Sequence, residues 1–280
     1  MIILDTKKDY KNHIDILKFN GEIISLVPTM GNLHDGHLSL VKIAKKNSSK
    51  VITTIFVNPL QFGKNEDFAS YPRTMNQDIS KLKQLNCDIL FAPKTKNEVF
   101  NNIDNLKNLE AGPKGNILCG KIRPGHFDGV LKVIYMLFQL TQPDLSVFGL
   151  KDFQQLYLIK RMAKMYFPKL KIISAPTIRT KNGLALSSRN SYLDKKSMKI
   201  APVFYKILLD GVINLKNSND VEKTVNYIKT NLEKNSFLVN YVSFLTTKLE
   251  KIKLNTPDKK ILLSSVKLGQ TRLIDNVEFS

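Results

Sequence analysis

The chain has 280 residues and a formal charge of +19, with 43 lysines and arginines against 24 aspartates and glutamates. Its hydrophobic content of 42% is enough for a packed core and excludes a mainly disordered chain. No apolar run reaches the roughly 18 residues of a membrane span. The first residues also lack the basic stretch of a secretory signal, so we expect no membrane partner.

Two sequence features bear on the cellular environment and on possible partners. The two cysteines, Cys87 and Cys119, form no C-x-x-C pair, which favours a reducing cytoplasm. The positive charge raises the alternative of a nucleic-acid-binding protein. However, only six of the 43 basic residues are arginine, and the lysines are scattered along the chain and mixed with Asn and Ile instead of forming one basic stripe. Readers of nucleic acid favour arginine and aromatic stacking, so we expect no nucleic-acid partner.

Apolar runs and amphipathic stretches alternate through the first 175 residues. In chain order they predict strands and helices over residues 23–28 (strand), 37–47 (helix), 51–57 (strand), 72–86 (helix), 88–92 (strand), 126–142 (helix), 144–148 (strand), 152–166 (helix) and 170–175 (strand). The run 51–57 is β-branched and nearly continuous, which is typical of a strand buried on both faces. This alternation predicts a doubly wound parallel sheet, a Rossmann-like α/β fold.

The pattern changes near residue 177. A loop rich in Ser, Asn, Gly and Arg over 179–190 leads into helical patterns over 196–215 and 220–235. Strand-like runs follow over 240–245 and 260–266. We therefore expect two domains, a Rossmann-like domain over 1–176 that binds nucleotide and a smaller C-terminal α+β domain over 177–280.

The first chemical signal lies where the strand 23–28 gives way to a helix, in Val27-Pro-Thr-Met-Gly-Asn-Leu-His-Asp-Gly-His37. A strand, a glycine turn and a helix start form the setting in which α/β sheets bind phosphates. Backbone N–H groups and the helix dipole there favour an anion, and His34 and His37 add donors for charge on a phosphoryl oxygen. Two alternatives are surface histidines and a His-x-x-His metal pair, although nothing nearby completes a ligand set.

The His-x-Gly-His turn is typical of the nucleotidyltransferases that form adenylates from ATP and a carboxylate. Further blocks make the sequence similar to the pantoate–β-alanine ligase family. These blocks are Phe56-Val-Asn-Pro-Leu-Gln-Phe62, Tyr71-Pro-Arg-Thr74, Arg123-Pro-Gly-His-Phe127, Lys151-Asp-Phe-Gln-Gln155, Gly183-Leu-Ala-Leu-Ser-Ser-Arg-Asn190 and Arg272-Leu-Ile-Asp-Asn276. They stand in the family's order and span essentially the whole chain.

The resemblance implies an amide-forming ligase that condenses (R)-pantoate with β-alanine through a pantoyl adenylate. It also implies ATP as a substrate, Mg²⁺ as the accompanying ion and a homodimer. One alternative keeps the adenylate chemistry but takes a different carboxylate as substrate.

By the same resemblance, His34, His37 and Lys151 are the catalytic residues, and Asp78 is associated with magnesium. The residues placed against ATP are Met30, Gly31, Asn32, Leu33, His34, Asp35, Gly36, His37, Gly149, Leu150, Lys151, Asp152, Ile178, Leu186, Ser187, Ser188 and Arg189. Those placed against pantoate or β-alanine are Asn58, Gln61, Arg123, His126 and Gln155.

The chain departs from the family pattern at two positions. Cys119 and Leu150 stand where the family usually has glutamate, which removes two carboxylates from the expected site region. We expect an active enzyme all the same, because the other residues that the resemblance picks out are present. We also expect the loop 179–190 to be an interdomain closure element, mobile without ATP and ordered with it, since Gly183 gives it backbone freedom.

Overall fold

The computed structural model describes residues 1–64, 66–100, 106 and 109–280. That part of the chain folds into two compact units. The first comprises Met1–Leu150 and Gln154–Pro176, and the second comprises Lys151–Phe153 and Thr177–Ser280. The functions expected of the two parts stay predictions.

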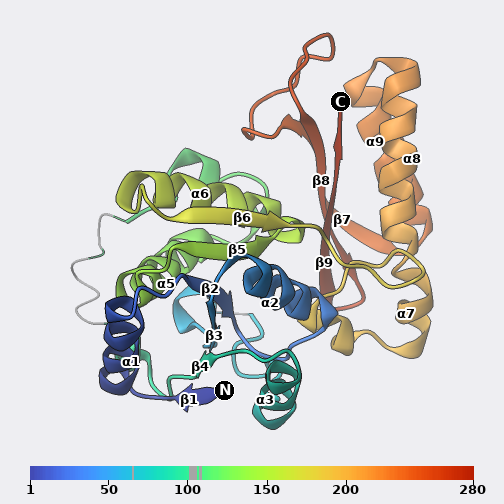
Figure 1. Ribbon diagram of the computed structural model, residues 1–280. Coiled ribbons are helices and arrows are strands. Elements are labelled where there is room, and N and C mark those ends of the chain that lie inside the picture. The colour runs from blue at the N-terminus through green and yellow to red at the C-terminus, as the bar shows by residue number, and fades with distance from the viewer. Residues whose placement is uncertain (65, 101–105, 107–108) are drawn as a thin grey trace. The chain divides into compact units, whose positions relative to one another are not determined.

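A six-stranded sheet forms the centre of the first unit, with the strand order β1-β4-β3-β2-β5-β6 (Figure 1). Its strands are β1 (Ile2–Leu4), β2 (Ile24–Thr29), β3 (Lys50–Ile55), β4 (Ile89–Phe91), β5 (Leu145–Gly149) and β6 (Lys171–Ala175). All five pairings between neighbouring strands are parallel. The doubly wound parallel sheet predicted from the sequence is therefore confirmed.

Helices connect these strands. They are α1 (Lys7–Phe19), α2 (Asp35–Asn47), α3 (Met75–Gln84), α4 (Cys119–Ile122), α5 (His126–Thr141) and α6 (Phe153–Tyr166), with 3-10 turns η1 (Pro59–Gln61), η2 (Lys96–Glu98), η4 (Pro113–Gly115) and η5 (Leu150–Asp152). In the described ranges, no helix combines the length and the apolar character that crossing a membrane requires.

Each face of the sheet has its own apolar core. Residues of α1, α5 and α6 form one core with the sheet, and residues of α2 and α3 form the other. The alternation of side chains along β2 explains the division, because Leu26 lies in the first core and Val27 in the second. Near-continuous apolar strands are what a sheet covered on both faces requires.

The position of β2 in the sheet determines where a ligand can bind. It lies between β3 and β5, so the chain proceeds to one side of β2 first and later to the other. In open α/β sheets, ligands bind at the carboxyl ends of the strands beside such a switch point. The turn of residues 30–34 follows the carboxyl end of β2 and leads into α2.

An antiparallel sheet of β7 (Phe237–Thr246), β8 (Lys260–Leu268) and β9 (Thr271–Phe279) forms part of the second unit. The remaining elements are η6 (Ser188–Tyr192), α7 (Lys195–Ile200), α8 (Val203–Ser218) and α9 (Val221–Lys234). Residues of α8, α9 and the sheet share one core. The helices and the antiparallel sheet of this unit agree with the α+β secondary structure predicted for residues 177–280.

Several element boundaries differ from the sequence prediction. The helical pattern over 196–215 forms two helices, because Pro202 has no N–H to continue the hydrogen-bond ladder of α7. Four labelled helices and strands, β1, α1, α4 and β9, were not predicted. In α1 only Tyr10 and Ile14 are buried, which leaves too sparse an apolar pattern to detect. In β9 polar residues interrupt the alternation.

Candidate active site

The turn after β2 brings the backbone close to its neighbours. Gly31 and Asn32 have φ angles of 82° and 49°, in the left-handed region. A Cβ on Gly31 would lie 3.0 Å from Cγ2 of Ile55 and 3.2 Å from Oδ2 of Asp78. Glycine therefore meets two needs at once, the positive φ and the close approach to β3 and α3.

His34 and His37 cap the start of α2. Nδ1 of His34 accepts a hydrogen bond from the backbone N–H of Gly36 at 3.1 Å. Nδ1 of His37 accepts one from the backbone N–H of His34 at 3.4 Å. The two rings lie 4.1 Å apart between centroids. Because both Nδ1 atoms act as acceptors, each neutral ring carries its proton on Nε2, as a donor.

The start of α2 has the properties of an anion site. It offers the backbone N–H groups and the positive dipole end of a 13-residue helix, next to the two imidazoles. Leu33, in contrast, is 2% exposed and packs in the core beneath α2, so its side chain is closed to a ligand. Of the expected ATP-binding stretch, Met30 to His37, the backbone and the histidines are the chemically suited parts.

Two amide side chains lie together beside Met30. Nδ2 of Asn58 donates to Oε1 of Gln61 at 3.1 Å and to the carbonyl oxygen of Gly129 at 3.0 Å. Nε2 of Gln61 points to the sulfur of Met30 at 3.0 Å. Asn58 is 1% exposed and Gln61 is 9% exposed. Asn58 thus fixes the orientation of the Gln61 amide, with its oxygen toward Asn58 and its nitrogen toward the turn.

The predicted substrate-binding residues Arg123 and His126 join this network. Nδ1 of His126 lies 2.8 Å from the carbonyl oxygen of Gln61, and its Nε2 lies 2.6 Å from Nη1 of Arg123. A carbonyl only accepts and a guanidinium only donates, so His126 is neutral with its proton on Nδ1. Arg123 also forms two 2.6 Å hydrogen bonds with the carboxylate of Glu66. A substrate carboxylate would have to share Arg123 with Glu66.

Asp78, which the resemblance associates with magnesium, is fully buried in the first turn of α3. Its oxygens accept from the backbone N–H of Asn32 at 2.9 Å and of Leu33 at 2.8 Å, and from the hydroxyl of Thr74 at 3.1 Å. Mg²⁺ keeps several waters and needs open carboxylate oxygens, so Asp78 does not fit a direct ligand. Among the described residues, no group of three or more His, Cys, Asp or Glu side chains is arranged to hold a metal.

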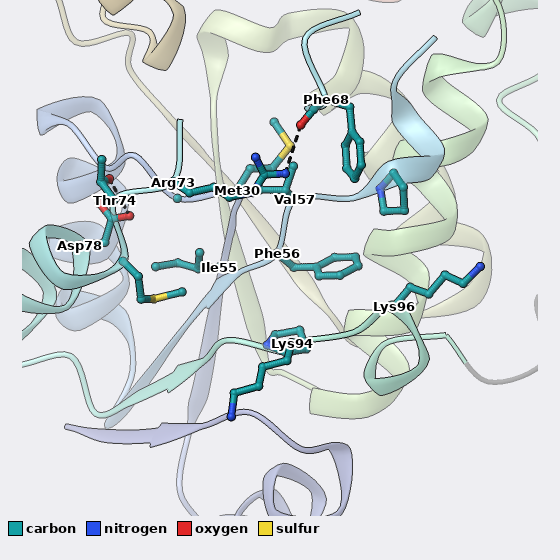
Figure 2. Close-up of a pocket in the computed structure, with 14 residues that line it drawn as sticks. Met30, Ile55, Phe56, Val57, Phe68, Arg73, Thr74, Asp78, Lys94 and Lys96 are labelled. Carbon is teal, nitrogen blue, oxygen red and sulfur yellow. Dashed lines mark hydrogen bonds between the residues drawn. The ribbon is translucent and has the colours of Figure 1, made fainter. Parts of the chain in front are cut away.

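A pocket of about 510 Å³ opens beside the turn, where Met30 and Gly31 form part of its lining (Figure 2). Most of the other lining side chains are apolar: Ile55, Phe56, Val57, Pro59, Phe68, Met75 and Pro93. Arg73, Lys94 and Lys96 add positive charge. The volume suits a small molecule, although neither histidine of the turn is among the lining residues.

The expected ATP-binding run at the end of β5 is divided between the two units. Gly149 and Leu150 belong to the first unit, whereas Lys151 and Asp152 belong to the second. Within the second unit, the side-chain amide of Asn276 on β9 donates to the carbonyl oxygen of Lys151 at 3.0 Å. The C-terminal block Arg272 to Asn276 therefore helps to hold the backbone of the predicted catalytic lysine.

The remaining predicted ATP-binding residues lie in the segment 178–190 of the second unit. The backbone N–H of Leu186 donates to the carbonyl oxygen of Ile178 at 2.9 Å. This bond joins the beginning of the segment to a residue near its end. Arg179 forms two hydrogen bonds with the buried Asp275, at 2.6 and 2.8 Å, and its guanidinium lies 3.4 Å from the ring centroid of Tyr205. Ser187, Ser188 and Arg189 follow, with Ser187 capping the turn η6.

Cys119 and Leu150, which replace the glutamates usual in the family, both pack against the core shared by α1, α5 and α6. The backbone N–H of Cys119 donates to Oε1 of Gln154 at 3.1 Å. Gln154 is 5% exposed, whereas its neighbour Gln155, the predicted pantoate contact, is half-buried on α6. The surroundings of both replaced positions thus suit apolar side chains.

Sequence reasoning missed two residues that contact the predicted site. One is Glu66, the partner of Arg123, for which the local sequence gives no signal. The other is Lys81, whose Nζ donates to the carbonyl oxygen of Leu33 at 2.6 Å. Lys81 lies three residues after Asp78, on the same face of α3, so the helical spacing could have indicated it.

Comparison with known proteins agrees with the resemblance. A family model described as pantoate-beta-alanine ligase matches residues 2–278. A pantothenate synthetase from Acinetobacter baumannii is 43% identical over 258 residues, which cover 92% of this chain and 90% of the relative. One from Buchnera aphidicola subsp. Acyrthosiphon pisum is 45% identical over 284 residues, covering 99% and 98%.

Solved structures match over the same extent. The pantothenate synthetase of Thermus thermophilus superposes with a TM-score of 0.89 at 33% identity, covering 99% of both chains. The pantoate-beta-alanine ligase of Francisella tularensis gives a TM-score of 0.82 at 36% identity, covering 99% of this chain and 97% of that one. The latter was solved in complex with beta-gamma ATP and beta-alanine.

Proposed function

The chain belongs to the pantoate–β-alanine ligase family, and we propose that it joins (R)-pantoate to β-alanine with ATP to give pantothenate, AMP and pyrophosphate. It is thus a ligase that forms a C–N bond. The observation that carries the proposal is the pair of capping histidines at the start of α2, in a chain that the family model matches almost from end to end.

The reaction needs two steps, because a free carboxylate is a poor acylating agent. In the first, a carboxylate oxygen of pantoate attacks the α-phosphorus of ATP, and the bond to the bridging oxygen breaks to release pyrophosphate. In the second, the amine of β-alanine attacks the acyl carbon, AMP leaves with the carboxylate oxygen, and the nitrogen loses a proton. Such chemistry depends mainly on positioning and on stabilising charge.

For the first step, we assign the developing phosphoryl charge to the start of α2. The Nε2 protons of His34 and His37 and the helix N–H groups are donors that need no reorganisation when charge appears. We assign a fixed positive charge to Lys151 and the leaving pyrophosphate to Ser187, Ser188 and Arg189. The other ATP contacts proposed are the backbone of residues 30–36, Gly149, Leu150, Asp152, Ile178 and Leu186.

For pantoate and β-alanine, we assign the network around Gln61. The geometry that supports this is the orientation of the Gln61 amide by Asn58 and of the Gln61 backbone by His126. Arg123 supplies the positive charge for a carboxylate, and Gln155 supplies an amide that both donates and accepts. Glu66 then acts as a competitor for Arg123 until substrate arrives.

Four further features stay proposals: the ion, the cellular location, the oligomeric state and the role of the second domain. We expect Mg²⁺ to enter with the phosphates of ATP, as it usually does in such enzymes, and we assign no step to it. We place the protein in the cytoplasm, in keeping with its free cysteines, Cys87 and Cys119. We expect a homodimer, and a second domain that acts as a lid over the nucleotide.

The experiment that tests the proposal is exchange of labelled pyrophosphate into ATP. We expect exchange that depends on pantoate and needs no β-alanine, because only the first step is reversed. Exchange supported by a different carboxylate would favour another adenylate-forming enzyme. If no carboxylate supports exchange and the chain binds RNA in a salt-sensitive way, the nucleic-acid alternative replaces the proposal.

A further inference from the structure

Helix α3 carries a buried carboxylate, that of Asp78, which the family resemblance associates with magnesium. In the structure its partners are protein hydrogen-bond donors. In the first turn of α3, Asp78 is 0% exposed and uses both carboxylate oxygens within the protein. Oδ1 accepts from the N–H of Leu33, while Oδ2 accepts from the N–H of Asn32 and the hydroxyl of Thr74. A carboxylate has about four acceptor sites, so three of them are committed to protein donors.

The two backbone donors belong to consecutive residues of the turn that precedes the histidines. This turn adopts left-handed φ angles at Gly31 and at Asn32, which is not a glycine. Asparagine tolerates this region better than other non-glycine residues, and neighbours that bind its backbone stabilise the conformation further. Charge-assisted hydrogen bonds to both N–H groups are shorter and stronger than neutral ones, and they suit this conformation.

A second side chain of α3 holds the same turn from its carbonyl side. Nζ of Lys81 donates to the carbonyl oxygen of Leu33 at 2.6 Å. Asp78 therefore binds the N–H of Leu33, and Lys81 binds the carbonyl oxygen of the same residue. The next residue is His34, which caps α2 and is in turn bonded to His37.

We propose that Asp78 is a positioning residue that holds the turn 31–34 in place for His34 and His37, with Lys81 as its partner, and that it is not a magnesium ligand. The turn determines where His34 caps α2, and His34 is bonded to His37. A displaced turn therefore displaces the Nε2 donors of both histidines. The catalytic part of this inference rests on the proposed function, whereas the structural part does not.

The test compares Asp78→Asn with Asp88→Asn. Asp88 is a matched control, because its carboxylate also accepts a backbone N–H, that of Val51 at 2.8 Å, and a side-chain bond, from Nζ of Lys45 at 3.1 Å in the last turn of α2. These contacts lie at the amino end of β3, away from the turn. Hydrogen exchange of the metal-free proteins is measured by peptide. We expect Asp78→Asn to accelerate exchange over residues 31–34 by about tenfold, as for a lost charged hydrogen bond, with Asp88→Asn leaving this peptide unchanged.

Kinetics of pyrophosphate exchange provide the second readout. We expect Asp78→Asn to lower kcat by about 10–100-fold, with the half-saturating Mg²⁺ concentration within twofold of that of the parent chain. A tenfold rise in that Mg²⁺ concentration, with exchange over 31–34 unchanged, would overturn the inference in favour of a metal ligand.

A milder variant, Lys81→Met, keeps the test decisive if Asp78→Asn does not fold. We expect it to accelerate hydrogen exchange over residues 31–34 and to lower kcat more than it raises the KM for ATP. Unchanged hydrogen exchange over residues 31–34 and an unchanged kcat would overturn the proposal that Asp78 and Lys81 hold the turn. If the parent chain shows no pantoate-dependent exchange, the proposed function fails, and hydrogen exchange still decides the role of Asp78.

Discussion

The turn 30–34 in the first unit and the segment 178–190 in the second both carry predicted ATP-binding residues, and a buried carboxylate from another element holds each of them. Asp78 is 0% exposed and, in the described part of the chain, accepts from two backbone N–H groups and a hydroxyl. Asp275 is 3% exposed and pairs with the guanidinium of Arg179. A buried carboxylate thus serves a different purpose in each region. Asp78 orients a backbone, whereas Asp275 neutralises the charge of Arg179.

The difference predicts different costs when each carboxylate is removed. A buried acceptor of backbone N–H groups defines local geometry, so its loss should be felt mainly in the chemistry nearby. A buried partner of arginine balances a charge, so its loss leaves that charge without compensation and affects stability first. Three substitutions and the binding of ATP, taken from the largest expected effect to the smallest, test this contrast and the assignments around it.

Replacing Asp275 with alanine should give the largest loss of stability. Arg179 would keep its stacking on Tyr205 but lose both charged hydrogen bonds in a site where its side chain is 17% exposed. We expect the free energy of unfolding of the second unit to fall by about 3–5 kcal/mol, measured by urea denaturation. The double change Asp275→Leu with Arg179→Met should cost clearly less, and equal losses would contradict a charge-balancing role.

Replacing His37 with alanine should affect rate instead of stability. Loss of one donor aimed at developing charge costs about 10²–10³ in rate, or about 3–4 kcal/mol. We expect this loss in pantoate-dependent pyrophosphate exchange, with the urea midpoint nearly unchanged. His13→Ala is the matched control, because His13 lies on α1 and contacts only its own helix in the bonds described. Activity of His37→Ala within threefold of the parent would contradict the assignment.

Restoring the carboxylates that the family usually has should have an intermediate effect. We expect Cys119→Glu with Leu150→Glu to change pyrophosphate exchange by less than about 100-fold. Since both positions pack against the apolar core of the first unit, the double variant should also be less stable. If the parent chain shows no exchange and this variant restores it, the natural protein is catalytically impaired and these positions have been misjudged.

The smallest expected effect is a local change in the segment 178–190 when ATP binds. The sequence predicts a mobile loop over the whole of 179–190, but in the structure residues 179–185 are held by Asp275 and by backbone hydrogen bonds. We therefore expect the hydrogen exchange of 179–185 to stay the same when ATP binds. Ser187 to Arg189 should gain phosphate partners, and their exchange should slow by about tenfold, equivalent to about 1.4 kcal/mol. Unchanged exchange over 187–189 at saturating ATP and magnesium would rule out a closure role for this segment.

The parts of the fold with strong local signals were predictable from the sequence. Apolar strands such as 51–57 and the amphipathic helix 37–47 depend on their own side-chain patterns, so the parallel sheet could be predicted without the structure. The short strand β1 and the sparsely buried helix α1 depend on partners elsewhere in the chain. Their sequences alone carry little of that information.

The site shows the same division between local and long-range information. The turn with His34 and His37 has a sequence motif, because its glycine, cap and helix start are neighbours in the chain. The pairing of Arg123 with Glu66 joins residues 57 positions apart, and that of Arg179 with Asp275 joins residues 96 apart. Asp78 was noticed only by resemblance, which did not indicate that Asn32 and Leu33 occupy its oxygens.

Transfer of a labelled oxygen tests the central claim most directly. Pantoate with ¹⁸O in its carboxylate is incubated with ATP, β-alanine and the enzyme, and the products are analysed by mass spectrometry. If the carboxylate attacks the α-phosphorus and AMP later leaves with that oxygen, each AMP carries one ¹⁸O atom and pyrophosphate carries none. Formation of ADP together with ¹⁸O-labelled inorganic phosphate would contradict the adenylate mechanism, as would formation of unlabelled AMP.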